Sequence, residues 1–389
     1  MFKSVRVGSL VGIPIKLDIT LLIVLPAFTW LIGARITEIA GILSDVPRLS
    51  IDVAAISGGL MPWILGLAAA IGLFVGVTLH ELGHSVVAIR YGYAIDSITL
   101  WLLGGLAQFT EQPREWTHEF WIAIAGPIVS VAIGVVSYLA VVILPSGLNA
   151  VSFVLGYLAV LNVTLAVFNM IPAFPLDGGR VLRALYHRST TLARATEKAV
   201  RVGKVFAVIL GIFGLLTFNI FMIAVAFFIY MAGSAEGRHT AIASVFEDVA
   251  VIEVMTPASE VTSVRPGLSV ADLFDRMLDD RYSGYPVVED GDIVGIVTLD
   301  DIKAVSPEDR ETQQVRSIMQ RDLTTISLDN TAMEAFTQLS RSQTGRLLVM
   351  DGDRFVGLIT RTDIARAFEI LKERRVRPSS EIAQVPLER

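Results

Sequence analysis

Residues 61–91 read MPWILGLAAAIGLFVGVTLHELGHSVVAIRY, an apolar run whose last third carries two histidines and a glutamate. A run of this length is typical of a membrane-spanning helix. On a helix, His80 and His84 lie four residues apart and project from one face, where both imidazoles can bind one metal ion. Ionisable groups inside a span cost free energy and mark a functional site by default. The run therefore predicts a membrane helix that carries a zinc site.

Glu81 follows the first histidine, so that the motif has the pattern H-E-x-x-H. In this pattern the glutamate acts as the general base that takes a proton from the attacking water. The same spelling also arises by chance, and the alternative is a pair of core histidines that hydrogen-bond to neighbouring helices. The cost of placing these groups inside a span favours the catalytic interpretation.

The composition separates an apolar first half from an acidic second half. Of the 389 residues 53% are hydrophobic, and the mean hydropathy of +0.61 is too high for a soluble globular protein. The formal net charge of −6 is unevenly distributed, because the chain from Ser244 onward carries 26 acidic and 17 basic residues. This division predicts a membrane domain followed by a soluble one. The acidity of the second half argues against nucleic acid as a partner.

The chain contains no cysteine. A disulfide, a thiolate metal site and a cysteine nucleophile are therefore excluded, and any zinc must be held by histidine and carboxylate side chains. A catalytic zinc site uses three protein ligands, so one more ligand must join the two histidines of the motif.

Apolar segments predict a polytopic α-helical bundle with about six spans. We expect these spans at residues 17–34, 61–91, 116–144 and 151–171, with two more in the block 202–231. That block is too long for one ordinary span, and the Thr-Phe-Asn sequence at 217–219 is expected to turn it into two rather short helices. Residues 1–16 alternate loosely and predict a short strand or an interfacial segment.

Basic residues set the expected orientation of the spans. The segment after the fourth span carries seven of them: Arg180, Arg183, Arg188, Arg194, Lys198, Arg201 and Lys204. The loop after the first span carries only Arg35 and Arg48. By the positive-inside rule the basic segment after the fourth span is cytoplasmic. Because six spans put both termini on the same side, both termini and the acidic half are then expected to be cytoplasmic as well. The second and fourth spans then both run toward the cytoplasm and end at the same level.

The fourth span ends in residues 168–180, FNMIPAFPLDGGR. Two prolines break the helix there, two glycines allow tight turns, and Asp177 is left at membrane depth. Two imidazoles and one carboxylate with an open position form a standard catalytic zinc set. Local sequence alone would also allow Asp177 to cap the helix that begins near Arg180. The common level of the two spans favours Asp177 as the third zinc ligand.

Two asparagines share a face of the fourth span, because Asn162 and Asn169 are seven residues apart. Each could hydrogen-bond a substrate backbone or a developing oxyanion, and each could equally bond to a neighbouring helix. We assign Asn169 to substrate binding because it adjoins the broken segment. We assign Asn162 to interhelical hydrogen bonding.

Residues 97–109, SITLWLLGGLAQF, predict two strands around a Gly-Gly turn. A peptide must be extended to be cleaved, so the edge of a hairpin near the zinc could receive it by strand addition. The alternative is a connector that packs on the helical bundle.

Three motifs together resemble the site-2 protease family of intramembrane zinc proteases. They are HELGH at 80–84, AGP at 125–127 and NMIPAFPLDGG at 169–179. Their order and their places on the spans are specific, and the resemblance covers most of residues 1–240. It implies a six-helix bundle that hydrolyses peptide bonds in or near the transmembrane segments of membrane-anchored protein substrates.

The resemblance also implies roles for individual residues. His80, His84 and Asp177 would hold one Zn2+ per chain, and Glu81 would be the catalytic base. Asn169 occupies the asparagine position that is implicated in substrate or transition-state binding in that family.

The soluble half contains a repeated pattern. Residues 254–302 and 317–364 each run through a strand, a helix, two strands and another helix. The first helix of each copy is expected at 269–280 and 330–342. Two copies form a paired module and not a solenoid, and the pair strongly resembles tandem CBS (cystathionine beta-synthase type) domains.

The predicted fold class is multi-domain, with a polytopic α-helical membrane bundle followed by a soluble α/β CBS pair. We place the domains at residues 1–240, 248–305 and 312–370. The charged residues 371–389 are expected to form a disordered tail.

The CBS resemblance implies a ligand, an adenine nucleotide (AMP, ADP or ATP). In that family the Thr and Asp of the G-h-h-T-x-x-D pattern contact phosphate and ribose, which here are Thr298, Asp301, Thr360 and Asp363. A strand-to-helix turn exposes amides and a hydroxyl, which suits such contacts. The alternative is that both aspartates are only helix caps and that the pair binds nothing.

Two functions fit these features. The first is an intramembrane zinc metalloprotease regulated by the CBS pair, with the lipid bilayer and a second copy of the chain, joined through the CBS domains, as further expected partners. The second is a membrane transporter or channel that is gated by the CBS pair and has a zinc site. The second leaves Glu81 without a role.

Overall fold

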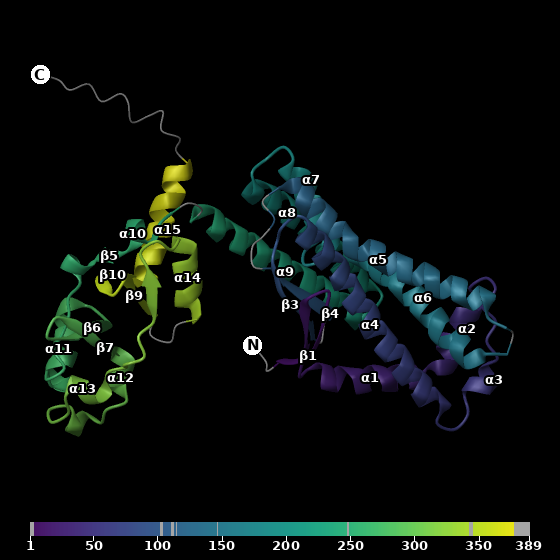
Figure 1. The fold of residues 1–389 in the computed structure, drawn as a ribbon, viewed down its shortest axis with the longest axis horizontal. Helices are drawn as coiled ribbons and strands as arrows, with labels where there is room; N and C mark the ends of the chain where they lie inside the picture. Colours follow the sequence, from purple (N-terminus) through teal and green to yellow (C-terminus); the bar gives the residue numbers. More distant parts are fainter. Residues whose placement is uncertain are drawn as a thin grey trace, which may run out of the picture. The chain divides into compact units, whose positions relative to one another are not determined.

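The computed structural model describes residues 4–101, 104–109, 113, 115–145, 147–246, 249–341 and 345–376. The chain divides into two compact units, Met1–Thr240 and Ala241–Arg389. The first unit is a helical bundle with a small sheet, and the second is an α/β unit (Figure 1).

Five helices of the described chain are long and apolar enough to span a membrane, which makes this a multi-pass membrane protein. They are α4 (Met61–Arg90), α5 (Trp116–Ile143), α6 (Asn149–Asn169), α8 (Leu192–Leu216) and α9 (Ile220–Val245). A sixth span is formed if the bent pair α1 (Leu21–Ala34) and α2 (Ile36–Ser44) crosses as one element, with a bend of 68° between them. This count agrees with the predicted bundle of about six spans.

Two details of the predicted spans need correction. The first helix begins at Leu21 and not at residue 17, because strand β2 (Ile13–Asp18) occupies the residues before it. The turn at residues 217–219 is confirmed, but the helices on either side of it have 25 and 26 residues and are not short. They extend past the apolar block at both ends, through polar residues that the hydropathy pattern does not count.

A four-stranded sheet brings the N-terminal segment beside the hairpin that follows α4. Its order is β1 (Ser4–Leu10), β2, β3 (Ile95–Trp101) and β4 (Gly104–Phe109). Strands β2 and β3 are parallel, and the other pairs are antiparallel. The expected Gly-Gly turn is wrong, because Gly104 pairs with Trp101 and Gly105 with Leu100 in the strand ladder; the residues between the two strands, 102–103, lie outside the described chain. Gly104 and Gly105 instead begin β4, and Gly105 lies against helix α4.

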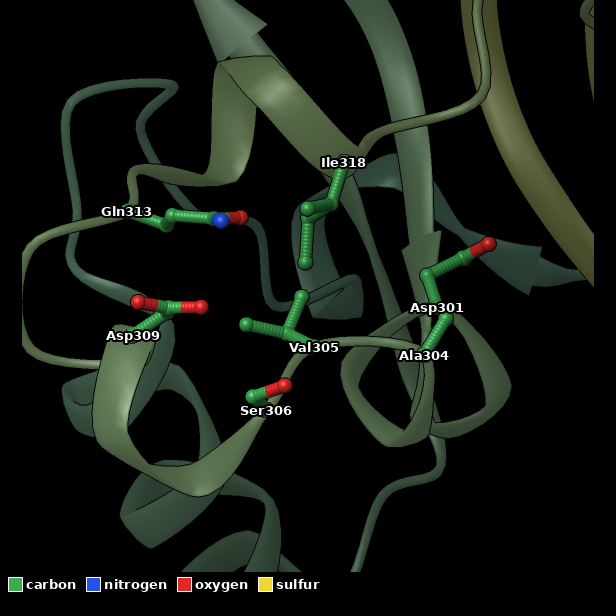
Figure 2. A pocket seen from close by; sticks show the side chains of 7 residues that line it. All are labelled: Asp301, Ala304, Val305, Ser306, Asp309, Gln313 and Ile318. Carbon is green, nitrogen blue, oxygen red and sulfur yellow. The ribbon is translucent and has the colours of Figure 1, made fainter.

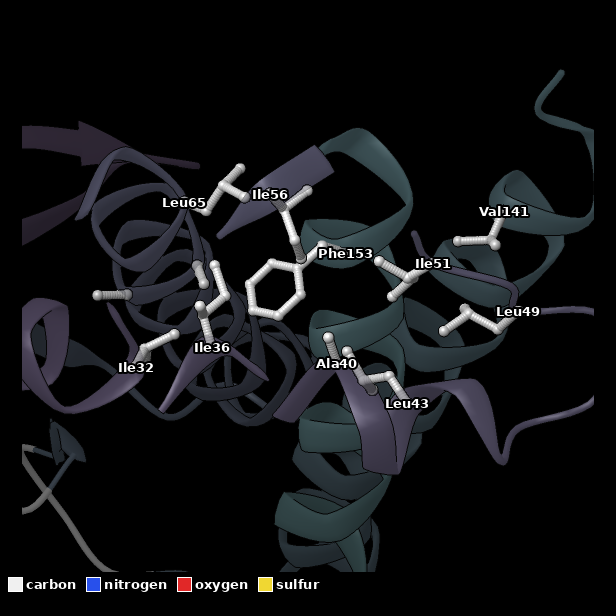
Figure 3. Close-up of a cluster of buried hydrophobic side chains, with 12 residues drawn as sticks. Ile32, Ile36, Ala40, Leu43, Leu49, Ile51, Ile56, Leu65, Val141 and Phe153 are labelled. Atoms are coloured by element: carbon white, nitrogen blue, oxygen red, sulfur yellow. The ribbon is translucent and has the colours of Figure 1, made fainter. Parts of the chain in front are cut away.

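Close helix packing holds the bundle. Figure 3 shows the fully buried Phe153 of α6 surrounded by aliphatic side chains, among them Ile36 and Ile56 of helices α2 and α3 (Val53–Ile56). At Gly66 of α4 an added Cβ would lie 2.5 Å from the Thr29 carbonyl oxygen of α1, so these helices touch backbone to backbone. Small residues at such contacts are the usual means of packing helices in lipid.

The second unit contains the predicted CBS pair. Its first copy has α10 (Val251–Val254), β5 (Thr256–Pro257), α11 (Val270–Asp280), β6 (Gly284–Glu289), β7 (Asp292–Thr298) and α12 (Leu299–Lys303). Its second copy has α13 (Val315–Ile318), β8 (Thr325–Ser327), α14 (Ala332–Arg341), β9 (Arg346–Asp351), β10 (Arg354–Thr360) and α15 (Arg361–Val376). Neither of the two main buried apolar clusters is confined to one copy: that of the first copy includes Val315 of α13, and that of the second includes Val251 and Val254 of α10.

A strand of the first copy joins the sheet of the second. The sheets have the orders β5-β10-β9-β8 and β6-β7, so β5 of the first copy pairs with β10 of the second.

The C-terminal helix is longer than expected, so the predicted disordered tail 371–389 starts too early. Helix α15 continues to Val376, which makes the first six residues of the expected tail 371–389 helical. The reason is that Leu371 packs on the apolar cluster of the second copy. Residues 377–389 lie outside the described chain.

Candidate metal centre

Helix α4 presents both histidines of the motif on one buried face. His80 and His84 are each 3% exposed, and their Nε2 atoms lie 3.2 Å apart. The four-residue spacing puts the rings one turn apart, which is why the helical periodicity alone could predict their approach.

Helix α5 orients the two rings through their other nitrogens. The Nδ1 of His84 donates to the carbonyl oxygen of Ile122 over 2.6 Å, and the Nδ1 of His80 lies 2.8 Å from the Ser130 hydroxyl oxygen. A ring that donates from Nδ1 keeps the lone pair of Nε2 free for a metal. Neither partner was predicted from the sequence, although Ile122, Gly126 and Ser130 stand at a four-residue spacing around the AGP motif.

The surroundings of Gly126 explain why the AGP motif at 125–127 needs a glycine at this position. A Cβ added there would overlap the His84 Nε2 atom and lie 2.8 Å from the Nε2 of His80. The absence of a side chain therefore keeps open the space in front of the Nε2 atoms of both histidines.

Asp177 completes the group from a different part of the chain. It is the first residue of α7 (Asp177–His187), is 9% exposed, and its Oδ2 lies 3.1 Å from the Nε2 of His80 and 3.3 Å from that of His84. The alternative of a helix cap is not what the structure has, because Leu176 is the N-cap residue and no side chain caps the helix. A Cβ at Gly179 would lie 2.6 Å from the Ala173 carbonyl carbon, so α7 starts in close contact with the turn before it.

The three donor atoms fit a zinc ion. Tetrahedral zinc with bonds of about 2.0–2.1 Å to nitrogen and oxygen places neighbouring ligands about 3.3–3.4 Å apart. The observed separations of 3.1, 3.2 and 3.3 Å match one face of such a tetrahedron. Two neutral imidazoles and a carboxylate are also the donor types that zinc accepts in catalytic sites, where a fourth position stays open.

The two asparagines of α6 behave differently. The Nδ2 of Asn169 lies 3.3 Å from the Nε2 of His80, so this side chain borders the metal centre. Asn162 is fully buried and donates to the Leu158 carbonyl of its own helix, while its Oδ1 has no hydrogen-bond partner within the described chain. The interhelical hydrogen bond expected for Asn162 is therefore absent. A Cβ at Gly76 of α4 would lie 2.7 Å from this oxygen, so Asn162 instead fills the space that Gly76 leaves.

Glu81 is half-buried and lies under strand β4. A Cβ added at Gly105 would overlap the Cγ of Glu81 and lie 3.2 Å from its Oε1. Within the described residues β4 pairs only with β3, so its other edge is an edge of the sheet. The strand that the sequence predicted near the zinc therefore lies directly beside the glutamate.

In the CBS pair, the expected ligand residues cap helices. The Thr298 amide and hydroxyl both donate to Asp301 Oδ2, and the Thr360 amide and hydroxyl donate in the same way to Asp363 Oδ2. The other oxygen of Asp301 accepts from Gln320 over 2.8 Å. Both aspartates therefore do cap helices, as the alternative expected. These hydrogen bonds also hold each Thr–Asp pair in one conformation.

Two cavities adjoin these caps. The larger, about 750 Å³, is lined by residues of both copies, including Thr298, Thr360 and Asp363 and the arginines Arg281, Arg346, Arg361 and Arg366. Burial, together with the neighbouring Arg361, lowers the pKa of Arg346, as expected where positive charge gathers. The smaller, about 340 Å³, has Asp301 on one side and Asp309 and Gln313 on the other (Figure 2). The larger one is therefore suited to an anionic ligand.

Both halves of the chain are similar to known protein families. The model of Peptidase family M50 matches residues 68–153 and 145–210, and the CBS domain model matches 251–308 and 315–370. A zinc metalloprotease of Methanocaldococcus jannaschii is 35% identical over 96% of this chain and 98% of its own length. The Rip3 protein of Mycobacterium tuberculosis is 30% identical over 97% of this chain and 96% of its own. The solved site-2 protease of M. jannaschii is 36% identical, over 60% of this chain and 95% of that one, with a TM-score of 0.40.

The chain belongs to peptidase family M50, as a membrane-embedded metalloprotease that carries a CBS pair. Relatives that match over nearly the whole chain are named as zinc metalloproteases, so zinc is the metal this family implies. The predicted family and enzyme class are thereby confirmed. The alternative of a transporter or channel is not supported, because these relatives share both halves of the chain.

Proposed function

We propose that this chain is an intramembrane zinc metalloprotease that hydrolyses peptide bonds in or near the transmembrane segments of membrane-anchored protein substrates. One Zn2+ per chain is held by His80, His84 and Asp177, and Glu81 is the general base. The observation that carries the proposal is the approach of three buried donor atoms to 3.1–3.3 Å from two distant segments, beside a glutamate.

The chain's own residues divide the work of hydrolysis. When bound, zinc supplies Lewis acidity to water and to the scissile carbonyl. Glu81 takes the proton of the attacking water and later gives it to the leaving amine. The hydrogen bonds that the imidazoles of His80 and His84 make with the Ser130 hydroxyl and the Ile122 carbonyl keep both rings in the orientation that faces the centre.

Substrate binding uses two elements that border the centre. Asn169 donates from Nδ2 to the substrate carbonyl near the cleavage point, a role that its approach to His80 supports. The substrate lies extended along the outer edge of β4, where main-chain hydrogen bonds would align it over Glu81. Gly105 permits the strand to run that close to the glutamate.

The proposal also covers the orientation of the chain in the membrane and the regulation of the protease by the CBS pair. Basic residues after the fourth predicted span support cytoplasmic termini and a cytoplasmic CBS pair. We assign Thr298, Asp301, Thr360 and Asp363 to adenine-nucleotide binding, with phosphate at the arginines. The arginine-lined cavity supports this for Thr298, Thr360 and Asp363, which line it, whereas Asp301 lines the smaller cavity. A second copy of the chain, joined through the CBS domains, is the proposed assembly.

Replacing Glu81 by Gln tests the proposal. The amide keeps the size of the side chain but cannot take a proton, so the variant should retain zinc and lose cleavage of a model transmembrane substrate by about 10²–10⁴-fold. Cleavage at the wild-type rate by the zinc-loaded variant would contradict the assigned base. Thr164→Ala, at an exposed site on α6, serves as the control.

A further inference from the structure

A buried ionic group lies outside the metal centre, and the proposed chemistry does not use it. Arg183 of α7 donates from Nε to Glu119 Oε1 over 2.6 Å and from Nη1 to Glu236 Oε1 over 2.6 Å. Arg183 is 4% exposed and Glu119 is 1% exposed. The second oxygen of Glu119 is buried and has no hydrogen-bond partner within the described chain.

Stability does not explain such a group. Two carboxylates and one guanidinium carry a net negative charge, and taking these charges out of water costs free energy that their attraction only partly repays. Apolar residues of similar volume usually hold helices together as well or better. A buried ionic group is better suited to fixing geometry, because a guanidinium bonds carboxylates only in defined directions.

The positions of the three residues connect this geometry to the metal centre. Arg183 stands six residues after Asp177 on the same helix, and its guanidinium lies 5.1 Å from the ring centroid of Phe174, in the turn that leads into Asp177. On α5, Glu119 lies one turn before Ile122, and the carbonyl oxygen of Ile122 accepts the hydrogen bond from His84. The Arg183–Glu119 pair therefore ties the helix of the carboxylate ligand to the helix that orients the histidines.

Glu236 brings in a third helix. It lies on α9, which ends at Val245, beyond the boundary between the two units after Thr240. Its side chain is 29% exposed, so its bond to Arg183 lies at the edge of the group. Because Glu236 lies on α9 and Glu119 on α5, a shift of α9 would act on the Arg183–Glu236 bond and not directly on the Arg183–Glu119 pair.

We propose that Arg183 is a positioning residue for the metal centre: with Glu119 it fixes the start of α7 so that Asp177 stays in place against His80 and His84, and through Glu236 it makes that placement depend on α9. This inference rests on the proposed zinc site. It assigns Arg183 no contact with substrate or with the reacting atoms.

The test measures the metal site directly. Wild type, Arg183→Met, Arg183→Lys and Glu236→Gln are purified in detergent as full-length chains, and zinc affinity is measured by competition with a chelator. The absorption spectrum of the Co2+-loaded proteins reports the ligand geometry. Arg201→Met, which removes an exposed arginine paired with Glu197 on α8, is the matched control.

We expect Arg183→Met to bind zinc about 10–100-fold more weakly, as is typical for loss of a residue that orients a ligand. Its Co2+ spectrum should change and its kcat should fall, while KM stays within about twofold because no substrate contact is lost. Arg183→Lys should recover part of the affinity, and Glu236→Gln should change it in the same direction by less. Arg201→Met should match wild type.

Several outcomes would overturn the inference. Folded Arg183→Met with wild-type zinc affinity and Co2+ spectrum would show that the group only stabilises the bundle, even if the melting temperature falls. If Arg183→Met does not fold, unchanged zinc affinity in both Arg183→Lys and Glu236→Gln would overturn it equally. Wild type that binds no zinc would instead contradict the proposed metal site.

Discussion

Gly126→Ala is the most informative single-atom change to the metal centre. The added methyl group would lie 2.8 Å from the His80 Nε2 atom and would overlap that of His84. An ordinary contact of a Cβ atom is at least 3.4 Å, so the imidazole of His80 would have to move by at least about 0.6 Å. Metal sites keep their ligand distances within about 0.2 Å. The required shift is therefore about three times what the site tolerates.

This misfit predicts a loss of zinc affinity by about 100-fold or more, which corresponds to about 2.8 kcal/mol. Chelator competition on the detergent-purified protein measures it, and cleavage of a model transmembrane substrate should fall in parallel. Gly134→Ala is the matched control on the same helix, because its methyl group would lie 2.8 Å from Val163 of α6 and not from a ligand. Overpacking there should cost about 1–3 kcal/mol of stability and leave zinc bound. Full zinc content in folded Gly126→Ala would refute this account of the glycine.

Three further predictions concern the other proposed parts. Gly105→Ala should displace Glu81 and lower kcat by up to about 10²–10⁴-fold with zinc retained, and an unchanged kcat would count against the placement of β4. Asp363→Ala should weaken ATP binding in calorimetry by about 1.5–3 kcal/mol, the value of a charge-assisted hydrogen bond, and equal affinity would remove this residue from the site. Because the chain has no cysteine, an impermeant maleimide on the cytoplasmic side should label Ser9→Cys and spare Ser57→Cys; labelling of neither or both would contradict six spans with cytoplasmic termini.

The sequence was sufficient to predict that the three proposed metal ligands approach one another, because this approach follows from two simple rules. Helical periodicity places His80 over His84, and the count of basic residues places Asp177 at their level. Both inferences use only residue type and order. The structure agrees with them to within hydrogen-bond distance.

Other parts of the centre carry no such signal. The ring of His84 donates a hydrogen bond to the backbone carbonyl of Ile122, and every residue has a carbonyl. The partners of Arg183 are 64 and 53 residues away, and no local pattern pairs them. These contacts depend on how helices pack, which composition does not specify.

The fold was predictable at the level of elements and less so at their ends. The bend of 68° between α1 and α2 was not foreseen, because Arg35 and Glu38, at and just after the bend, indicate the start of a polar loop and not a change of helix direction. Helices α8 and α9 run beyond their apolar block through polar residues, which the hydropathy pattern does not count as part of a span. Hydropathy detects what lies in lipid, whereas a helix ends where its backbone hydrogen bonds end.

The central claim is that His80, His84 and Asp177 hold a catalytic zinc ion. The most direct test is the zinc content of detergent-purified wild type and Asp177→Ala by mass spectrometry, with cleavage of a model transmembrane substrate measured on the same samples. We predict about one zinc per chain in wild type, and loss of both zinc and cleavage in the variant. Full zinc in the variant would remove Asp177 from the ligand set, and active wild type without zinc would contradict the mechanism.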